Sequence, residues 1–310
     1  AGSWWCSRRR FRSCSTSAIA DGLDPHATVE RDAMDRWRSW NAAKLPGRAV
    51  NRFIRGWSRN NLALEVHRTA CIVTHPPGGE GANDALVNPA NERLQGTRFS
   101  PEQCWKELYG DPTTGRWDKD YATYPFQSVD GLVTEFCGDG LSKALAALPA
   151  DEHGVKVATG NAIVTRAHGE LTELYSHLIH AVAPFYRLAP NACDWEAQTK
   201  STYHSALIAA QRENLNAIAL PLLGAGVRGV DLPAGEALRV AAEATVGWDG
   251  ADEPLTIRFG VQDSTTANAL ADAIVAAMQT LDREDEFELM ARPDGERWAL
   301  RPDEKRVMHG

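Results

Sequence analysis

The feature that most constrains this chain is a change of pattern at Leu62. From there to Leu281, short apolar runs of about four to eight residues alternate with longer segments that have the apolar spacing of a helix. Such alternation predicts an α/β domain in which helices cover a sheet. The expected strands lie near Ala63–Thr74, Ala85–Asn88, Lys156–Thr159, Ser176–Ala181, Ala217–Leu222 and Leu255–Val261, and the expected helices at Gly131–Ala147, Lys200–Glu213, Ala234–Val246 and Thr265–Leu281.

Residues 1–60 differ from this domain in charge. They hold 12 Lys and Arg against 5 Asp and Glu, which leaves 21 against 36 in residues 61–310. The first twenty residues are rich in Arg and Ser and contain no acid, as in a transit peptide to a mitochondrion or plastid; a plain tail on a cytoplasmic or nuclear protein is the alternative. We therefore expect a basic extension over 1–60, with an amphipathic helix at Val29–Lys44, before a domain at 61–282.

Composition also excludes several classes of protein. The acidic balance of residues 61–310 argues against a basic face that clamps duplex nucleic acid. No run of about 18 apolar residues occurs, so we expect no membrane span; Ala269–Met278 comes nearest and is interrupted by Asp272. The six cysteines form no CxxC pair, which predicts free, mostly buried thiols in a reducing intracellular compartment. We predict neither a metal nor a cofactor, and the oligomeric state stays open.

Residues 283–310 predict a C-terminal hairpin tail. Its strands are expected at Phe287–Arg292 and Arg297–Arg301, joined by a turn at Pro293-Asp294-Gly295. An isolated hairpin is marginally stable in water, so this one must pack on another element or fray.

Two asparagines close the short buried strand in Asp84–Asn91. Asn88 and Asn91 stand at its carboxyl end, where open α/β sheets bind ligands. A carboxamide can both donate to and accept from ribose hydroxyls, so both residues are candidate ligand contacts. The alternative is that they cap the turn that follows.

A glycine loop follows the strand at Ile218–Leu223. Its glycines let the backbone approach a phosphate closely and turn N–H groups toward it, an arrangement that the next helix N-terminus also favours. The GxGxxG spacing also fits a dinucleotide-dependent oxidoreductase, although an acid at the required distance, Asp249, falls in a loop. The candidate ligand-binding residues here are Gly224, Ala225, Gly226, Val227, Arg228 and Gly229.

Asp130 lies at the expected start of a helix. The helix dipole favours its ionised form, which suits a general base, although N-capping is the commoner role of such a residue. His168 and His180 also invite a catalytic reading; for His180, between Ile179 and Ala181, a role in the core is favoured.

Read together and in order, five segments resemble the macrodomain family. They are NPAN at 88–91, VDG at 129–131, TGNA at 159–162, IHAVAP at 179–184 and PLLGAGVRG at 221–229. The resemblance extends over roughly Leu62–Leu281. It implies a three-layer α/β/α sandwich with a central mixed sheet, and a cleft for ADP-ribose at the strand ends.

The resemblance also implies roles for individual residues. Asn91 matches the ribose-contacting asparagine, Gly224–Gly229 the phosphate loop, and Asp130 the acid that activates a water in the hydrolytic members. Asp130 and Asn91 are therefore the candidate catalytic residues. The implied ligand is ADP-ribose or a related nucleotide diphosphate, and the implied activity is hydrolysis of ADP-ribose esters on proteins or in O-acetyl-ADP-ribose. The alternatives are a non-catalytic reader of ADP-ribosylated protein and an NAD(P)-dependent oxidoreductase.

Three departures from the family pattern change these expectations. Residues 92–129 replace a short glycine loop with an aromatic-rich insertion, which would act as a lid or block the cleft. Cys71 or a neighbour stands where the family places an acid for adenine, and a thiol is a poor acceptor. Arg228 replaces an aromatic ring, so it would pair with a ligand phosphate or lie in solvent, and Thr134 replaces a histidine found in many hydrolases.

Overall fold

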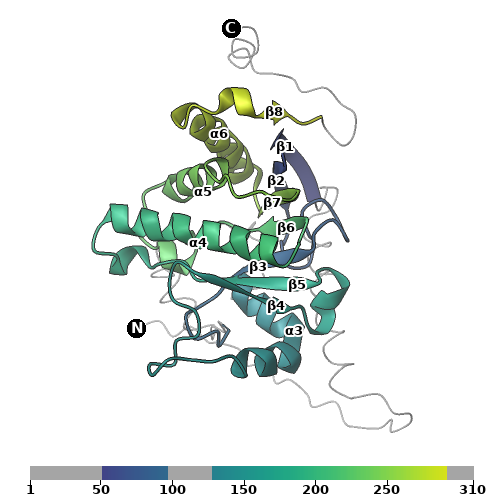
Figure 1. The fold of residues 1–310 in the computed structure, drawn as a ribbon, viewed down its shortest axis with the longest axis vertical. Helices are drawn as coiled ribbons and strands as arrows, with labels where there is room; N and C mark the ends of the chain where they lie inside the picture. The colour runs from purple at the N-terminus through teal and green to yellow at the C-terminus, as the bar shows by residue number, and fades with distance from the viewer. Residues whose placement is uncertain (1–50, 97–127, 292–310) are drawn as a thin grey trace, which may run out of the picture.

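A computed structural model of the chain describes residues 51–96 and 128–291, and every structural statement below concerns these residues (Figure 1). The expected transit-like segment, the helix at Val29–Lys44 and the aromatic residues at 105–126 lie outside them. The main elements are β1 (Asn51–Arg59), β2 (Leu62–Thr69), β3 (Ala85–Pro89), α3 (Val129–Ala146), β4 (Ala162–Arg166), β5 (His177–Ala181), α4 (Ala192–Arg212), β6 (Ala217–Leu220), α5 (Glu236–Val246), β7 (Leu255–Val261), α6 (Ser264–Thr280) and β8 (Glu288–Leu289).

The strands form one mixed sheet in the order β4-β5-β3-β6-β7-β2-β1-β8. From β5 to β2 each strand runs parallel to its neighbour. The remaining pairs are antiparallel: β4 with β5, β1 with β2, and β8 with β1. The parallel strands therefore all end at the same side of the sheet, which we call the carboxyl edge. Loops that follow β3, β5 and β6 meet there, although these strands are far apart in the sequence.

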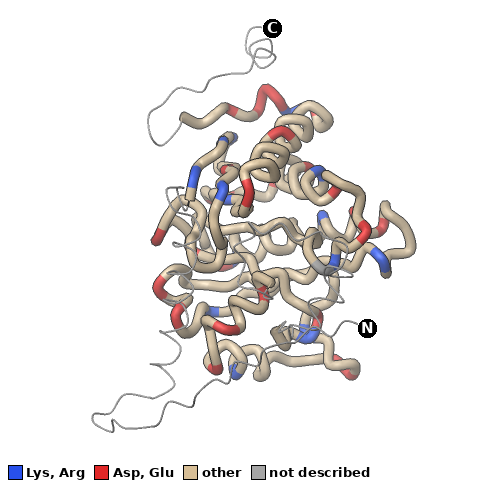
Figure 2. Tube along the Cα trace, turned by 180° about the vertical axis from the view of Figure 1, so that it is seen from behind, with Lys and Arg blue, Asp and Glu red and all other residues tan. Residues whose placement is uncertain are grey.

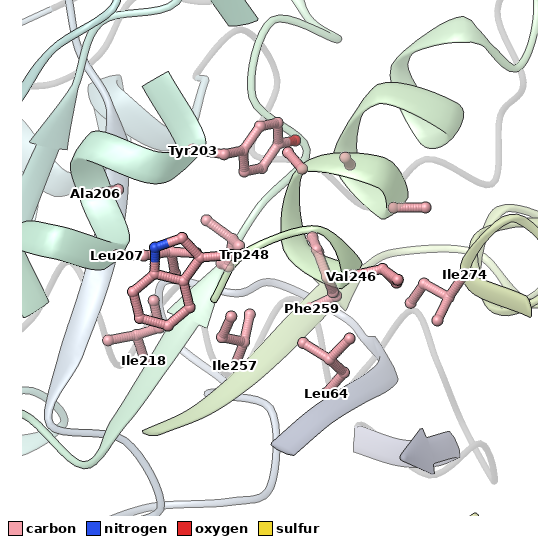
Figure 3. Packing of buried hydrophobic residues seen from close by; sticks show 14 of the residues in the cluster. Leu64, Tyr203, Ala206, Leu207, Ile218, Val246, Trp248, Ile257, Phe259 and Ile274 are labelled. Carbon is pink, nitrogen blue, oxygen red and sulfur yellow. The ribbon is translucent and has the colours of Figure 1, made fainter. Parts of the chain in front are cut away.

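Helices cover both faces of the sheet, because alternate residues of a strand point to opposite sides. In β3, Ala85 and Val87 belong to a core shared with α4, α5 and α6, whereas Leu86 belongs to a second core under α3. Figure 3 shows the first core, where Leu207 of α4 lies near Ile218 of β6. The predicted three-layer α/β/α sandwich with a mixed sheet is thus confirmed (Figure 1).

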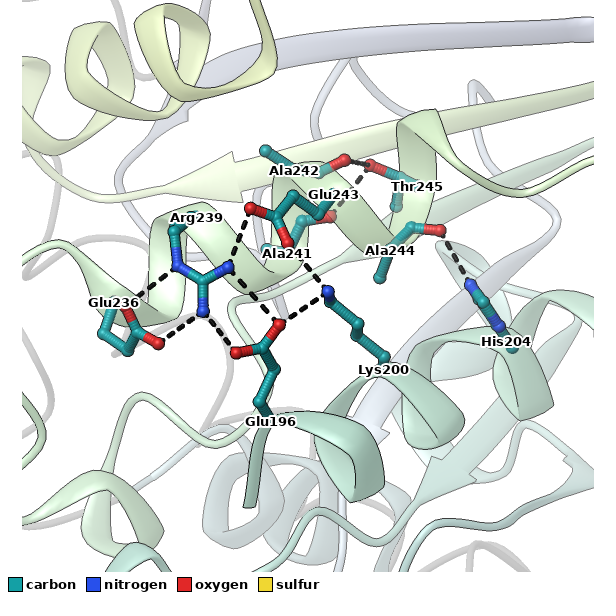
Figure 4. Close-up of polar contacts among 10 residues, drawn as sticks. All are labelled: Glu196, Lys200, His204, Glu236, Arg239, Ala241, Ala242, Glu243, Ala244 and Thr245. Carbon is teal, nitrogen blue, oxygen red and sulfur yellow. Dashed lines mark hydrogen bonds and ion pairs between the residues drawn. The ribbon is translucent and has the colours of Figure 1, made fainter. Parts of the chain in front are cut away.

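Ion pairs hold α4 against α5. Arg239 lies 2.6 Å from Glu196 and also pairs with Glu236 and Glu243, while Lys200 joins Glu196 to Glu243 at 2.7 Å each (Figure 4). Hydrogen bonds from Arg239 and Lys200 lower the pKa of Glu196 to about 2. Elsewhere on the tube, Lys and Arg positions are scattered among Asp and Glu positions (Figure 2). We interpret this cluster as helix packing, because its charges are satisfied by one another.

The sheet begins earlier than predicted. Strand β1 (Asn51–Arg59) lies inside the segment that we assigned to the extension, and it pairs with β2 from Asn51↔Thr69 to Arg59↔Leu62. Arg59 is its main anchor, since its guanidinium bonds to Asp249, to Glu286 at 2.6 Å and to the Trp248 carbonyl at 2.6 Å. Three arginines in nine residues made this strand resemble the basic segment before it.

Other elements differ from the prediction in detail. Lys156–Thr159 is not a strand but a loop whose N–H groups at Lys156 and Val157 bond the Glu92 carbonyl, and the strand that follows it is β4. Helix α4 begins at Ala192 rather than Lys200, because Asn191 caps it by accepting from the Asp194 N–H.

The predicted hairpin is also revised. Strand β8 pairs with β1 through Trp57↔Leu289 and Ser58↔Glu288, so it joins the main sheet. The second expected strand, at 297–301, lies outside the described residues. None of the described helices is both long and apolar enough to cross a membrane.

Candidate functional site

The candidate site lies at the carboxyl edge, where loops after β3, β5 and β6 meet. The Ala90 N–H bonds the Ala181 carbonyl at 2.9 Å, which joins the first two loops. The Gly160 N–H bonds the Val182 carbonyl at 2.8 Å, so the turn before β4 lies at the same place. The five sequence segments that we singled out therefore lie at or just beneath one edge, although they are spread along the chain from Asn88 to Gly229.

The glycine loop presents unpaired N–H groups at this edge. Ala225 and Gly226 are exposed, and the backbone N–H groups of Gly224, Ala225 and Gly226 have no hydrogen-bond partner among the described residues. Gly224 has φ +73°, a conformation that favours glycine. A methyl group at Gly226 would meet nothing within 4 Å, whereas one at Gly229 would lie 2.3 Å from the Gly224 carbonyl oxygen. The loop therefore has open space beside Gly226 and is tightly packed against its own backbone at Gly229.

The helix that follows this loop begins close to the predicted position, at Glu236 instead of Ala234. Between the glycine loop and α5 the chain passes through a short 3-10 turn at Val227–Gly229, so the N-terminus of α5 does not adjoin the loop. Any anion selectivity of the loop must therefore come from its own N–H groups.

Arg228 pairs with Glu92. Its guanidinium makes two parallel hydrogen bonds to that carboxylate, at 2.8 and 2.9 Å, donates to the Ala183 carbonyl and lies 4.4 Å from the centre of the Phe185 ring. Thr159 donates a further hydrogen bond to Glu92 at 3.0 Å. Of our two expectations for Arg228, the solvated side chain is not what the described structure shows, because the side chain is 13% exposed and paired with Glu92.

Glu92 is a residue that sequence reasoning missed. Partial burial acts to raise the pKa of its carboxyl group, but the hydrogen bonds and charge of Arg228, together with the Glu92 backbone and Thr159, lower it to about 2. The ionised pair joins the loop after β3 to the glycine loop, two segments 136 residues apart. We call the Glu92–Arg228 pair the loop bridge.

Asn91 caps its own turn. Its side-chain oxygen accepts hydrogen bonds from the N–H groups of Arg93, at 3.1 Å, and Gln95, at 3.3 Å. This is the alternative role that the sequence left open. The side chain is half-buried, and its amide nitrogen makes no hydrogen bond within the described residues, so that group is oriented by the cap and available to a ligand.

Asp130 and Asn88 lie together beneath the edge. The Asn88 amide donates to Asp130 at 2.7 Å, and its nitrogen also lies 3.3 Å from His180 Nδ1. Asn88 is 1% exposed and Asp130 is 4% exposed. Asn88, which the sequence predicted as a ligand contact, is therefore buried and supports Asp130 from within. The cap of α3 is Ser128, which accepts from the Gly131 N–H, so Asp130 is not the capping residue.

The remaining candidates make contacts within the fold. Thr134 donates to the Asp130 carbonyl at 2.8 Å, one turn back on α3. His168 packs against Gly140 of α3 and precedes the 3-10 helix at Gly169–Glu173. Cys71 is buried and is a free thiol, as is Cys137, while Cys193 is free and exposed. Within the described ranges, no group of three or more His, Cys, Asp or Glu side chains could hold a metal ion.

This geometry defines an α/β sandwich that presents a glycine loop and an amide-backed carboxylate at one sheet edge. The family model described as Macro domain matches residues 87–241, half of the chain. The chain belongs to the macrodomain family.

Solved structures show the same fold. The Oceanobacillus iheyensis macrodomain with ADP aligns with a TM-score of 0.55 at 18% identity, covering 75% of this chain and 100% of that one. A variant of that macrodomain with ADPR gives 0.54 at 18% identity, covering 74% and 99%. These comparisons and the helix start at Glu236 give no support to an oxidoreductase built on the GxGxxG spacing.

A curated relative is the non-structural polyprotein p200 of Rubella virus, strain RN-UK86. It is 40% identical over 111 residues, which cover 35% of this chain and 5% of the polyprotein. The shared segment is thus a small part of that relative.

Proposed function

We propose that this macrodomain binds ADP-ribose or a related nucleotide diphosphate at the glycine loop. The observation that carries the proposal is the run of unpaired N–H groups at Gly224, Ala225 and Gly226, of which the last two residues are exposed. Such a row holds a diphosphate without a cluster of Lys or Arg, which suits an acidic domain. The solved macrodomain structures with ADP and with ADPR support this choice of ligand.

The glycine at 226 offers a direct test. Because a methyl group there meets no atom of the protein within 4 Å, Gly226→Ala fills space that only a ligand would use. Overpacking of this kind costs about 1–2 kcal/mol, so we expect ADP-ribose affinity to fall roughly fivefold to thirtyfold in calorimetric titration. The unfolding midpoint is measured alongside, to confirm that the fold is kept. Equal affinities of wild type and variant would place the ligand elsewhere, and no binding by wild type would refute the proposal.

We also propose that the domain hydrolyses ADP-ribose esters, on mono-ADP-ribosylated protein or in O-acetyl-ADP-ribose. Asp130 would take a proton from a water whose oxygen attacks the ester, giving a carboxylic acid and ADP-ribose with a free hydroxyl. The support is the position of Asp130 in the first turn of α3, backed by an amide from β3. An acceptor of this chemistry would be an ADP-ribosylated protein partner.

A non-catalytic reader is the second candidate. Two observations favour it: the Asn91 side-chain oxygen already accepts hydrogen bonds from its own turn, and the Arg228 guanidinium is already paired in the loop bridge. Neither group is then free to act on a substrate. Asp130→Ala separates the two functions, because it should abolish release of ADP-ribose while leaving binding largely intact. Wild-type protein that binds ADP-ribose but releases none from modified acceptors would establish the reader.

A further inference from the structure

Four polar side chains from four elements meet under the N-terminus of α3. They are Asp130 of α3, Asn88 of β3, His180 of β5 and Thr165 of β4. Asn88 and His180 are direct neighbours in the parallel register of β3 and β5, and both are 1% exposed. Figure 1 shows α3 beside these three strands.

The hydrogen-bond donors and acceptors of this group fit only one arrangement. Asn88 Nδ2 donates one hydrogen to Asp130 Oδ1 at 2.7 Å, and its second hydrogen points to His180 Nδ1 at 3.3 Å. Nδ1 must then be an acceptor, so the ring proton sits on Nε2 and is donated to Thr165 Oγ1 at 2.9 Å. The histidine thereby fixes which way the Asn88 amide faces.

The arrangement requires a neutral histidine. Burial lowers the pKa of His180 to about 4, so the ring is uncharged at neutral pH and Nδ1 can accept. The Asn88 carbonyl oxygen is buried and has no partner among the described residues. A buried polar atom left unsatisfied is costly, which indicates that the amide is oriented for its two acceptors and not for its own oxygen.

We propose that Asn88 and His180 are positioning residues that hold the Asp130 carboxylate in the orientation needed for hydrolysis. Neither residue touches the substrate. His180 orients Asn88, and Asn88 orients Asp130, so the two form one unit. This inference rests on the hydrolase function proposed above. It assigns a role to the buried pair Asn88 and His180, although neither residue takes part in the reaction itself.

The test compares turnover and binding in the full chain. In Asn88→Leu and His180→Leu we expect kcat for O-acetyl-ADP-ribose to fall about tenfold to a hundredfold, because a small displacement of a catalytic group has that effect. ADP-ribose affinity should stay within about twofold, since the glycine loop is untouched. The double variant should lose no more than the worse single variant, because the two residues act in series.

Milder variants guard against loss of the fold. His180→Asn keeps an acceptor near the Nδ1 position and should retain more activity than His180→Leu. Thr165→Val removes only a hydroxyl and should reduce kcat by a smaller factor, whereas the matched Thr245→Val, in α5, should leave it unchanged.

The outcomes separate the two proposals. If wild type hydrolyses the ester and Asn88→Leu and Thr165→Val are folded and equally active, the positioning role is overturned and the hydrolase stands. A double variant in which the two reductions in kcat multiply, as for independent residues, would also overturn the positioning role. If wild type binds ADP-ribose without turnover, the hydrolase falls, and the positioning role falls with it.

Discussion

The loop bridge gives the sharpest prediction about stability. Glu92 and Arg228 join two loops through a bidentate contact in which the side chains are 31% and 13% exposed. We would replace them by Glu92→Gln and Arg228→Met, singly and together, and measure the free energy of unfolding in urea. The cycle isolates the interaction between the two side chains from the other contacts of Arg228.

The expected size follows from the pKa of Glu92. It falls from 4.5 to about 2 in the folded protein. At about 1.4 kcal/mol per pKa unit, the whole shift, to which the Glu92 backbone and Thr159 also contribute, corresponds to about 3 kcal/mol. Because nearly a third of the Glu92 side chain is exposed, solvent screening reduces the expected coupling to about 1–1.5 kcal/mol at pH 7.

The coupling should also depend on pH. Since folding lowers the pKa of Glu92, its stabilisation is fully present above about pH 4.5 and is lost as the pH falls toward 2. At pH 3 we expect less than roughly half of the pH 7 coupling to remain. The fully exposed pair Arg187–Asp231 is the matched control and should show no measurable coupling. A Glu92–Arg228 coupling below about 0.3 kcal/mol, or one that is equal at both pH values, would refute the reasoning.

Three further predictions concern the edge. Gly229→Ala should destabilise the fold by about 1–3 kcal/mol, because its methyl group would lie 2.3 Å from the Gly224 carbonyl; thermal unfolding beside Gly226→Ala measures this. Ala225→Asp should weaken ADP-ribose binding more than the isosteric Ala225→Asn, and the difference should shrink with added salt, since only the carboxylate repels a diphosphate. Glu92→Gln should strengthen ADP-ribose binding about threefold, because it leaves the Arg228 charge uncompensated near the loop; unchanged affinity would mean that Arg228 stays on the Ala183 carbonyl.

Much of the fold could be predicted because most strands are short apolar runs that can be recognised without knowing their neighbours in the sheet. Leu255–Val261 is a strand with the predicted bounds, and the apolar runs at Ala85 and Ala217 begin strands where expected. Strand β1 was missed because three of its nine residues are arginines and it continues a basic segment, and what makes it a strand is its pairing with β2. Pairing of that kind leaves little trace in composition.

The site was predictable in its loops but not in its pairings. The glycine spacing at 224–229 indicates a loop with free N–H groups, and this prediction does not depend on which segments pack against the loop. Which carboxylate Arg228 meets depends on how the loops after β3 and β6 converge, and Glu92 stands in no recognisable motif. The burial of Asn88 likewise follows from the position of α3 above β3.

The strand order has a practical consequence for anyone who trims this protein. The family match at 87–241 begins within β3 and stops inside α5, so a fragment cut to those limits would lack β7, β2 and β1. The apolar strand β6 would become an unpaired edge strand, and its buried side chains would lose the residues that they pack against. Such a fragment should aggregate, whereas one that starts before Asn51 and runs past Leu289 keeps every strand of the sheet.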